Sequence, residues 1–326
     1  MPGTFSIAVV SDIHYAAAEE RARCANWQFW RQIKNPAARI IGRAHHHFIW
    51  LRHRGAHNDL LDKFLAAAGQ PDLVIANGDY SCNTAQTGLN DPAAFASAEE
   101  CLGKLRARFG ANFRAIIGDH ELGKSDLFTG RGTMTLASWP RVTDGLGIEP
   151  FWRAQFEKYV LLGVTSSLVA LPLYIADAPA ADTGQWEQLR ETHLERIRNA
   201  FAGLKLDERV ILFCHDPSAL PFLWREPMVR EKISQLEQTI VGHLHTNLVL
   251  RTGRLLSGFP TITFLGKAAR KISRALGEAK LWKPFHVRLC PALTGIQLLK
   301  DGGWLSAELD AEARTPARFE FHPIRW

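Results

Sequence analysis

The chain has 326 residues, 46% of them hydrophobic, and a formal net charge of +6 at pH 7. This is enough material for a sizeable core, and it predicts one large domain or two modest ones. The five cysteines are scattered and include no CxxC pair, which excludes a disulfide framework and favours a reducing, cytoplasmic location.

The N-terminal apolar run has no cationic start and is interrupted by Asp12, so it predicts a strand and not a signal peptide. Residues 159–176 form an uncharged stretch of 18 residues, which is close to the length that spans a membrane. Gly163, the Thr-Ser-Ser cluster at 165–167 and Pro172 interrupt it. We therefore expect two buried strands around a turn, and no transmembrane helix.

Strand-like and helix-like segments alternate along the chain. The pattern predicts strands at 5–12, 71–79, 113–119, 159–166 and 209–216, helices at 57–70, 91–110 and 184–204, and a helix running into a strand at 233–246. Asp91 is expected to cap the second of these helices, with Pro92 in its first turn. Alternation of this kind indicates an α/β fold.

The C-terminal part is predicted to contain another strand at 260–266 and a hairpin over 285–310. The expected hairpin turn is the Asp-Gly-Gly sequence at 301–303. A basic run at 266–283 holds six Lys or Arg residues against one Glu.

Five apolar runs end in side chains that can bind metal. In chain order these are Asp12 with His14, Asp79, Asp119-His120-Glu121, His215 with Asp216, and His243 with His245. Ligand sites of open α/β sheets lie beyond the carboxyl ends of the strands, so we expect the five groups to converge on one edge. Asp12 and His14 are two residues apart, as are His243 and His245, and such side chains point the same way from an extended backbone.

Three Asp and four His side chains from these groups form a mixed oxygen and nitrogen ligand set. Imidazole suits transition metals such as Zn, Fe or Mn, whereas carboxylates suit harder ions. Seven ligands are too many for one transition metal but suit two ions that share a bridging carboxylate. Two ions about 3.5–4 Å apart can clamp an in-line displacement at phosphorus.

The motifs "SDIHY", "NGDYS", "GDHEL", "CHDPS" and "GHLHT" occur in this order and resemble the signature of the calcineurin-like metallophosphoesterases. That signature is D-x-H, GD, GNH[DE], H and GHxH, and the resemblance spans roughly residues 5–250. It implies a four-layer α/β sandwich of two mixed β-sheets flanked by helices. We expect one domain over 1–326, with a basic aromatic insert at about 16–56 and a basic helix plus hairpin extension at about 255–326.

The resemblance also implies how two divalent ions, Mn, Fe or Zn, would be held. One ion would bind Asp12, His14, Asp79 and His245, and the other would bind Asp79, Asp119, His215 and His243, so that Asp79 bridges them. A hydroxide bridging the ions would attack phosphorus. His120 would not be a ligand but would protonate the leaving oxygen or stabilise the transition state.

Asp119 departs from the family motif, which has Asn at this position. The added negative charge should tighten the second metal and repel a phosphate dianion more than a diester monoanion. We therefore expect a phosphodiester or pyrophosphate substrate. Glu121 is expected to orient the groups around the ligands.

Other candidate residues have simpler interpretations. The triplet His45 to His47 is not expected to form a third metal site, because consecutive histidines on a helix point in different directions. Cys82 and Cys214 are expected to be small buried side chains. His193 is predicted to lie on a helix surface, and Trp186 is predicted to pack its helix.

The insert at 16–56 holds eight Lys or Arg and two Glu, together with Trp27, Trp30 and Trp50. It would be either a solvated cap or oligomer contact, or a lid for an acidic substrate, nucleic acid or an anionic membrane surface. No sequence-reading nucleic-acid motif is present.

Two alternative functions stay open. The first is a hydrolase of lipid-linked or nucleotide-lipid phosphates at a membrane surface, as in lipid A synthesis. The second is a non-catalytic scaffold, and the presence of His120 argues against it.

Overall fold

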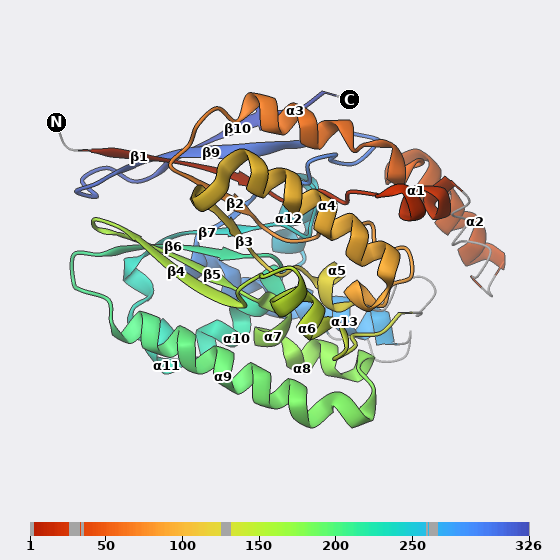
Figure 1. The fold of residues 1–326 in the computed structure, drawn as a ribbon. Coiled ribbons are helices and arrows are strands. Elements are labelled where there is room, and N and C mark those ends of the chain that lie inside the picture. Colours follow the sequence, from red (N-terminus) through yellow and green to blue (C-terminus); the bar gives the residue numbers. More distant parts are fainter. Residues whose placement is uncertain are drawn as a thin grey trace.

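The structure is a computed structural model, and it describes residues 3–25, 33, 36–124, 132–258, 260 and 267–325. The side chains of residue 38 and of residues 267–272 lie outside this description. Within it, two five-stranded sheets stack face to face between layers of helices (Figure 1).

The first sheet contains the strand that begins the chain. Its order is β10-β9-β1-β2-β3; β1, β2 and β3 are parallel, and β9 runs antiparallel to both β1 and β10. Within β1, Ile7 and Val9 face the other sheet while Ala8 and Val10 face helices, so both faces of the strand are buried. The strands are β1 Thr4–Val10, β2 Leu73–Ala76, β3 Phe113–Ala115, β9 Gly303–Asp310 and β10 Arg318–Pro323.

The second sheet has the order β4-β5-β6-β7-β8. Strands β5 to β8 are parallel, and β4 pairs antiparallel with β5. Side chains of both sheets, among them Ile75, Trp152 and Phe213, form the core between them. The strands are β4 Phe151–Phe156, β5 Tyr159–Val164, β6 Arg209–Cys214, β7 Leu236–Val241 and β8 Val287–Leu289.

Helices cover the outer face of each sheet and complete the four layers (Figure 1). The first sheet packs on α3 Asp59–Ala67 and α4 Pro92–Phe109, and the second packs on α9 Thr183–Ala202, α10 Leu220–Arg225, α11 Pro227–Glu231 and α12 Asn247–Leu255. The remaining helices are α1 Ala18–Ala25, α2 Pro36–Ala44, α5 Asp119–Leu122, α6 Ser138–Pro140, α7 Ser166–Val169, α8 Leu171–Tyr174 and α13 Lys267–Glu278. Asp91 caps α4 as predicted, accepting hydrogen bonds from the amides of Ala93 and Ala94 at 3.0 Å.

The predicted four-layer α/β sandwich with two mixed sheets is confirmed, but three local predictions were wrong. The uncharged stretch 159–176 contains only one strand, β5, and then turns into α7 and α8. The segment 233–246 has a single 3-10 turn before β7 in place of a full helix. The expected hairpin over 285–310 does not form, since β8 joins the second sheet and β9 joins the first.

The Asp-Gly-Gly sequence at 301–303 serves a different purpose from a hairpin turn. The Asp301 carboxylate accepts a hydrogen bond from the Ile296 amide at 3.2 Å, which closes the loop that leads into β9. The predicted strand at 260–266 lies almost wholly outside the described residues. Among the helices of the described residues, none is long and apolar enough to cross a membrane.

Candidate metal centre

The five predicted groups lie where β1, β2, β3, β6 and β7 end, and the backbone there leaves the extended conformation. Asp12 and His14 have φ of 49°, Asp79 and His243 of 60°, and His245 of 58°. The expectation that paired ligands point the same way from extended backbone was therefore wrong in its geometry. Each of these five residues is in the left-handed region, which is uncommon for non-glycine residues and often marks a functional site.

A first group contains Asp12, His14 and His245, whose ligand atoms lie within 4.8 Å of one another. The Nε2 atoms of the two histidines are 3.3 Å apart, and His245 Nε2 is 3.3 Å from Asp12 Oδ1. Asp12 is fully buried, and its carboxylate also accepts hydrogen bonds from Ser11 Oγ and the His243 amide. The carboxylate is thus fixed from behind while its Oδ1 faces the imidazoles.

A second group contains Asp79, Asp119, His215 and His243. His215 Nε2 lies 3.3 Å from Asp79 Oδ2 and 3.5 Å from Asp119 Oδ1, and His243 Nδ1 lies 3.4 Å from Asp119 Oδ2. Within the described residues, Asp79 Oδ2, Asp119 Oδ1 and His215 Nε2 are buried and make no hydrogen bond. Buried carboxylate oxygens and imidazole nitrogens that converge in this way fit a divalent cation.

Asp79 links the two groups. Its carboxylate belongs to the second group and also to a third, with His14 of the first group and His120. Glu121 holds this segment in place, as expected: its carboxylate accepts hydrogen bonds from the amides of Asp79 at 3.0 Å, Tyr80 at 2.9 Å and Gly118 at 2.8 Å. Burial and then the charge of Asp79 raise the pKa of Glu121 to about 8.

Close approach of the backbone requires glycine at two motif positions. A Cβ atom at Gly242 would lie 2.0 Å from Ser11 Oγ and 2.6 Å from Asp12 Oδ2, and one at Gly118 would lie 2.3 Å from Asp79 Oδ1. Any larger residue would therefore displace a candidate ligand.

Main-chain carbonyls orient three of the imidazoles. The Nδ1 atoms of His14 and His120 both lie 3.3 Å from the Ser81 carbonyl oxygen, and His215 Nδ1 lies 2.6 Å from that of Asn77. When Nδ1 carries the hydrogen it donates to the carbonyl, and Nε2 presents its lone pair to the cluster.

His120 lies at the junction of the two groups. Its Nε2 is 3.7 Å from Asp79 Oδ2, and its ring is 4.8 Å from the ring of His14, centroid to centroid. Burial lowers the pKa of His120 to about 3, although Asp79 opposes this shift. The distances would allow His120 to bind metal as well as to act on substrate, so its role as a non-ligand remains a proposal.

Lys124 also contacts this cluster, although it lies outside the five motifs. Its Nζ is 2.7 Å from Asp119 Oδ2, and its side chain is 28% exposed. Burial would raise the pKa of Asp119, but Lys124 and His243 hold it well below its usual range. The only sequence signal was the position of Lys124, three residues after the "GDHE" motif.

The insert also reaches the first group, through Trp50. The Trp50 ring lies 4.6 Å from the ring of His245, measured between centroids. The backbone of this part of the insert is held by Gln297, whose amide donates to the Trp50 carbonyl at 2.6 Å and whose side chain donates to the His47 carbonyl at 2.9 Å. Trp27 and Trp30 lie outside the described residues.

Four other predictions concern single side chains. Trp186, Cys82 and Cys214 are buried as expected. His193 is buried, not on the helix surface as predicted, and its Nε2 accepts a hydrogen bond from the Thr165 amide at 3.1 Å. A buried amide at the end of β5 needs an acceptor, and this need was invisible in the sequence.

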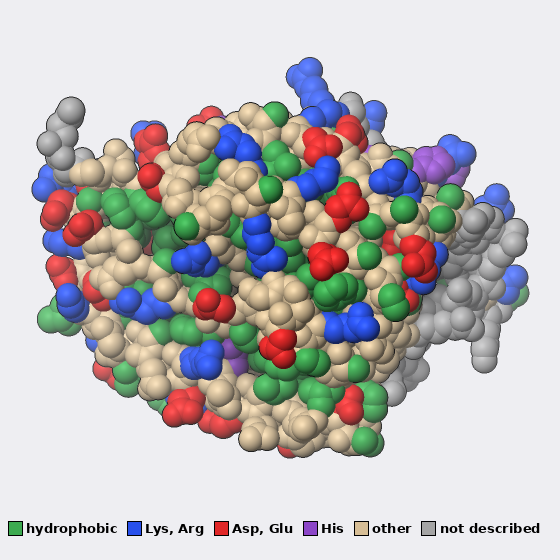
Figure 2. Space-filling model, in the orientation of Figure 1, with side chains coloured by type: hydrophobic (Ala, Val, Ile, Leu, Met, Phe, Trp, Pro, Cys, Tyr) green, Lys and Arg blue, Asp and Glu red, His purple; other side chains and the backbone are tan. Residues whose placement is uncertain are grey.

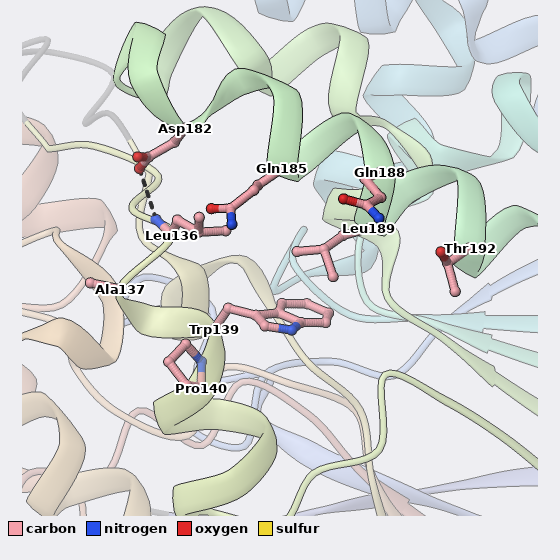
Figure 3. Close-up of a pocket in the computed structure, with 9 residues that line it drawn as sticks. All are labelled: Leu136, Ala137, Trp139, Pro140, Asp182, Gln185, Gln188, Leu189 and Thr192. Atoms are coloured by element: carbon pink, nitrogen blue, oxygen red, sulfur yellow. Dashed lines mark hydrogen bonds between the residues drawn. The ribbon is translucent and has the colours of Figure 1, made fainter.

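A separate pocket lies between α6 and α9 and contains none of the candidate ligands. It is lined by Leu136, Ala137, Trp139, Pro140, Asp182, Gln185, Gln188, Leu189 and Thr192 (Figure 3). Asp182 accepts a hydrogen bond from the Leu136 amide at 3.1 Å and so ties the two sides together.

On the face in Figure 2, basic and acidic side chains are interspersed and neither sign dominates.

A family model described as calcineurin-like phosphoesterase matches residues 5–247. The chain belongs to this family. No curated protein matches it significantly. As a calcineurin-like phosphoesterase, the chain has metal-dependent phosphoester hydrolysis as its general class of reaction, and its Asp and His groups can bind metals.

Solved structures similar to this family member are remote. Phosphopantetheinyl hydrolase from Mycobacterium tuberculosis is 12% identical, with a TM-score of 0.35, 75% of this chain covered and 84% of that one. A purple acid phosphatase from yellow lupin seeds is 10% identical, with a TM-score of 0.38 and coverages of 75% and 38%. A predicted phosphoesterase from Streptococcus pneumoniae is 8% identical, with a TM-score of 0.30 and coverages of 99% and 100%. These values carry no information about the substrate.

Proposed function

We propose that this calcineurin-like phosphoesterase hydrolyses a phosphodiester or a pyrophosphate with the help of two divalent ions, Mn, Fe or Zn. The observation that carries the proposal is the convergence of Asp and His side chains from five strand ends, joined through Asp79. Asp12, His14, Asp79 and His245 would hold one ion. The other would be held by Asp79, Asp119, His215 and His243.

When bound, the ions supply Lewis acidity and a water nucleophile at neutral pH. The protein holds the ligands with hydrogen bonds: the Asp79 amide donates to the Glu121 carboxylate, and the imidazoles of His215 and His14 donate to the carbonyls of Asn77 and Ser81. His120 would assist the leaving oxygen, either by protonating it or by stabilising the charge that develops there. Burial lowers the pKa of His120 to about 3, so the proton-donor role requires that the negative charge of a bound substrate raise this pKa. The negative charge of Asp119 supports a monoanionic diester over a dianionic monoester, because like charges repel.

The free thiols of the cysteines support a reducing, cytoplasmic location.

A hydrolysis screen of the metal-reconstituted protein would test the proposed activity. The substrates are diesters, monoesters, cyclic nucleotides and nucleotide-sugars, each assayed with Mn²⁺, Fe²⁺ or Zn²⁺. We expect turnover that a chelator abolishes, with diesters or pyrophosphates ahead of monoesters. Absence of metal-stimulated turnover on every substrate would instead favour a non-catalytic scaffold.

The role of His120 requires a second comparison. The change His120→Ala should keep both ions and lower the rate by roughly 10²–10⁴-fold, the usual scale for general acid catalysis. The loss should be much smaller for nitrophenyl esters, because their leaving group needs no proton. An equal loss on activated and unactivated esters would contradict the general-acid role.

An amphipathic, lipid-linked phosphate is the second candidate substrate, and exposed apolar side chains favour it. Of the exposed large apolar residues in the described part of the chain, most lie in three segments: Ile40, Ile41, Phe48 and Ile49 in the insert, Leu248, Val249, Leu255 and Leu256 in and just after α12, and Leu298 and Leu299. The Leu298 amide donates to the Ile49 carbonyl at 3.2 Å, and α12 begins two residues after His245. Exposed Arg39, Arg43 and Arg52 add positive charge. Apolar surface edged by basic residues fits an anionic lipid surface.

Liposome pelleting tests this second candidate. Changing Phe48 and Leu298, exposed by 65% and 60%, to Ser should weaken binding to anionic vesicles at low salt. The matched control is Leu206→Ser. The Leu206 side chain is 93% exposed, but it lies just after α9, away from the three segments in the sequence. Wild-type protein that does not pellet with the vesicles, or a control that loses as much binding as the double variant, would exclude the lipid surface.

A further inference from the structure

Lys124 places a cation directly against a candidate metal ligand. The ammonium nitrogen is 2.7 Å from Asp119 Oδ2, and the Asp119 carboxylate is only 3% exposed while the lysine side chain is 28% exposed. The ammonium therefore lies between a buried carboxylate and solvent. Lysine offers three donors and carries its charge as a point, which suits phosphate oxygens.

The position of Lys124 is set by the backbone on both sides. Gly123, with φ of 89°, ends α5, and its amide donates to the Asp119 carbonyl at 3.0 Å. A Cβ atom at Gly132 would lie 2.2 Å from the Lys124 carbonyl oxygen, so the chain returns tightly against this residue. The side chain that leaves this turn reaches the Asp119 carboxylate.

Lys124 lies at the edge of the second ligand group. The Asp119 carboxylate that it contacts is also 3.5 Å from His215 Nε2 and 3.4 Å from His243 Nδ1. The ammonium therefore shares its carboxylate partner with two imidazoles of this group, which also contains Asp79.

We propose that Lys124 binds a non-bridging phosphoryl oxygen of the substrate, through a charge-assisted hydrogen bond from its ammonium. This inference rests on the proposed function. A phosphoryl group that binds at the second ligand group would meet the ammonium beside Asp119.

The competing explanation is that Lys124 only balances the charge of Asp119 and so affects metal retention. The two explanations differ in what a neutral side chain changes. Loss of a substrate contact weakens anion binding while the metal content stays constant. Loss of a charge partner for Asp119 changes the metal content first.

The experiment measures binding of inorganic phosphate to Mn²⁺-reconstituted protein by calorimetry, together with metal content. Lys124→Met should weaken phosphate binding at least about tenfold, or about 1.4 kcal/mol, and should leave metal content unchanged. Lys124→Arg should retain most of the affinity because it keeps the charge. The matched control is Lys104→Met, since Lys104 pairs with Asp62 at 2.8 Å and is 33% exposed on the surface.

Wild-type phosphate affinity in Lys124→Met would overturn the proposal. So would a loss of affinity that follows a proportional loss of metal, or an equal loss in Lys104→Met. Because phosphate binding is measured without turnover, the result stands apart from the hydrolysis screen. Phosphate binding that depends on Lys124 in a protein without turnover would contradict the proposed function but not this contact.

Discussion

Five of the seven candidate ligands adopt a left-handed backbone conformation. For a residue other than glycine, this conformation costs about 1–3 kcal/mol. The conformation persists because hydrogen bonds fix it: the Asp12 amide donates to the Gly78 carbonyl at 3.1 Å, and the His14 amide donates to the Asp79 carbonyl at 3.0 Å. The sequence could predict which side chains gather here. It could not predict this backbone, because the dihedral angles depend on partners more than 60 residues away.

Asp79→Asn tests whether the Asp79 carboxylate is shared by the two ions. The amide keeps the shape of the carboxylate but removes its charge, so both sites should weaken together. We expect loss of metal and of hydrolytic activity in parallel. Elemental analysis that finds two metal ions per chain alongside near-normal turnover would rule out the bridging role.

Secondary structure was predictable at the element scale wherever a single segment carries its own pattern. β1, β2 and β6 are apolar runs that stop at a motif, and α4 has its cap in the sequence. The C-terminal strands were mispredicted because periodicity does not say which sheet a strand joins. β9 pairs with β1, and Thr4 and Asp310 are partners in that register. The insert and its contact with His245 likewise depend on Gln297, far along the chain.

His193 joins α9 to the end of β5 and should make stability depend on pH. Burial lowers its pKa to about 3, and Arg196 adds to the shift. The unfolded chain therefore takes up a proton near pH 6.5 that the folded chain does not, and stability falls as pH drops from about 6.5 towards 3. The largest slope for one group is about 1.4 kcal/mol per pH unit.

His193→Gln keeps an acceptor for the Thr165 amide and removes the titrating group. Urea unfolding at pH 7.5, 6.5 and 5.5 should show a shallower loss of stability than in the wild type, with His53→Gln as an exposed control. If the variant and the wild type lose stability in parallel over this range, His193 is not responsible for the acid sensitivity.

At the scale of the whole molecule, the candidate metal centre lies where strands of both sheets end. Asp12, Asp79 and Asp119 come from the ends of the first sheet, and His215 and His243 come from the second. The two halves of the sandwich thus each contribute part of the ligand set. A bound ion would join them, so its binding free energy adds to the stability of the native state.

Metal removal should therefore lower the melting temperature of the entire domain. For one site with free ligand at 100 times its Kd, the stabilisation is about 2.7 kcal/mol. We expect Mn²⁺ or Zn²⁺ to raise Tm in a concentration-dependent way and a chelator to reverse the rise, as followed by calorimetry. Asp79→Asn should lose most of this response because both sites need that carboxylate, whereas Lys104→Met should keep it. If the Tm of the wild type changes with neither metal nor chelator, the ligand groups do not hold ions across the two sheets.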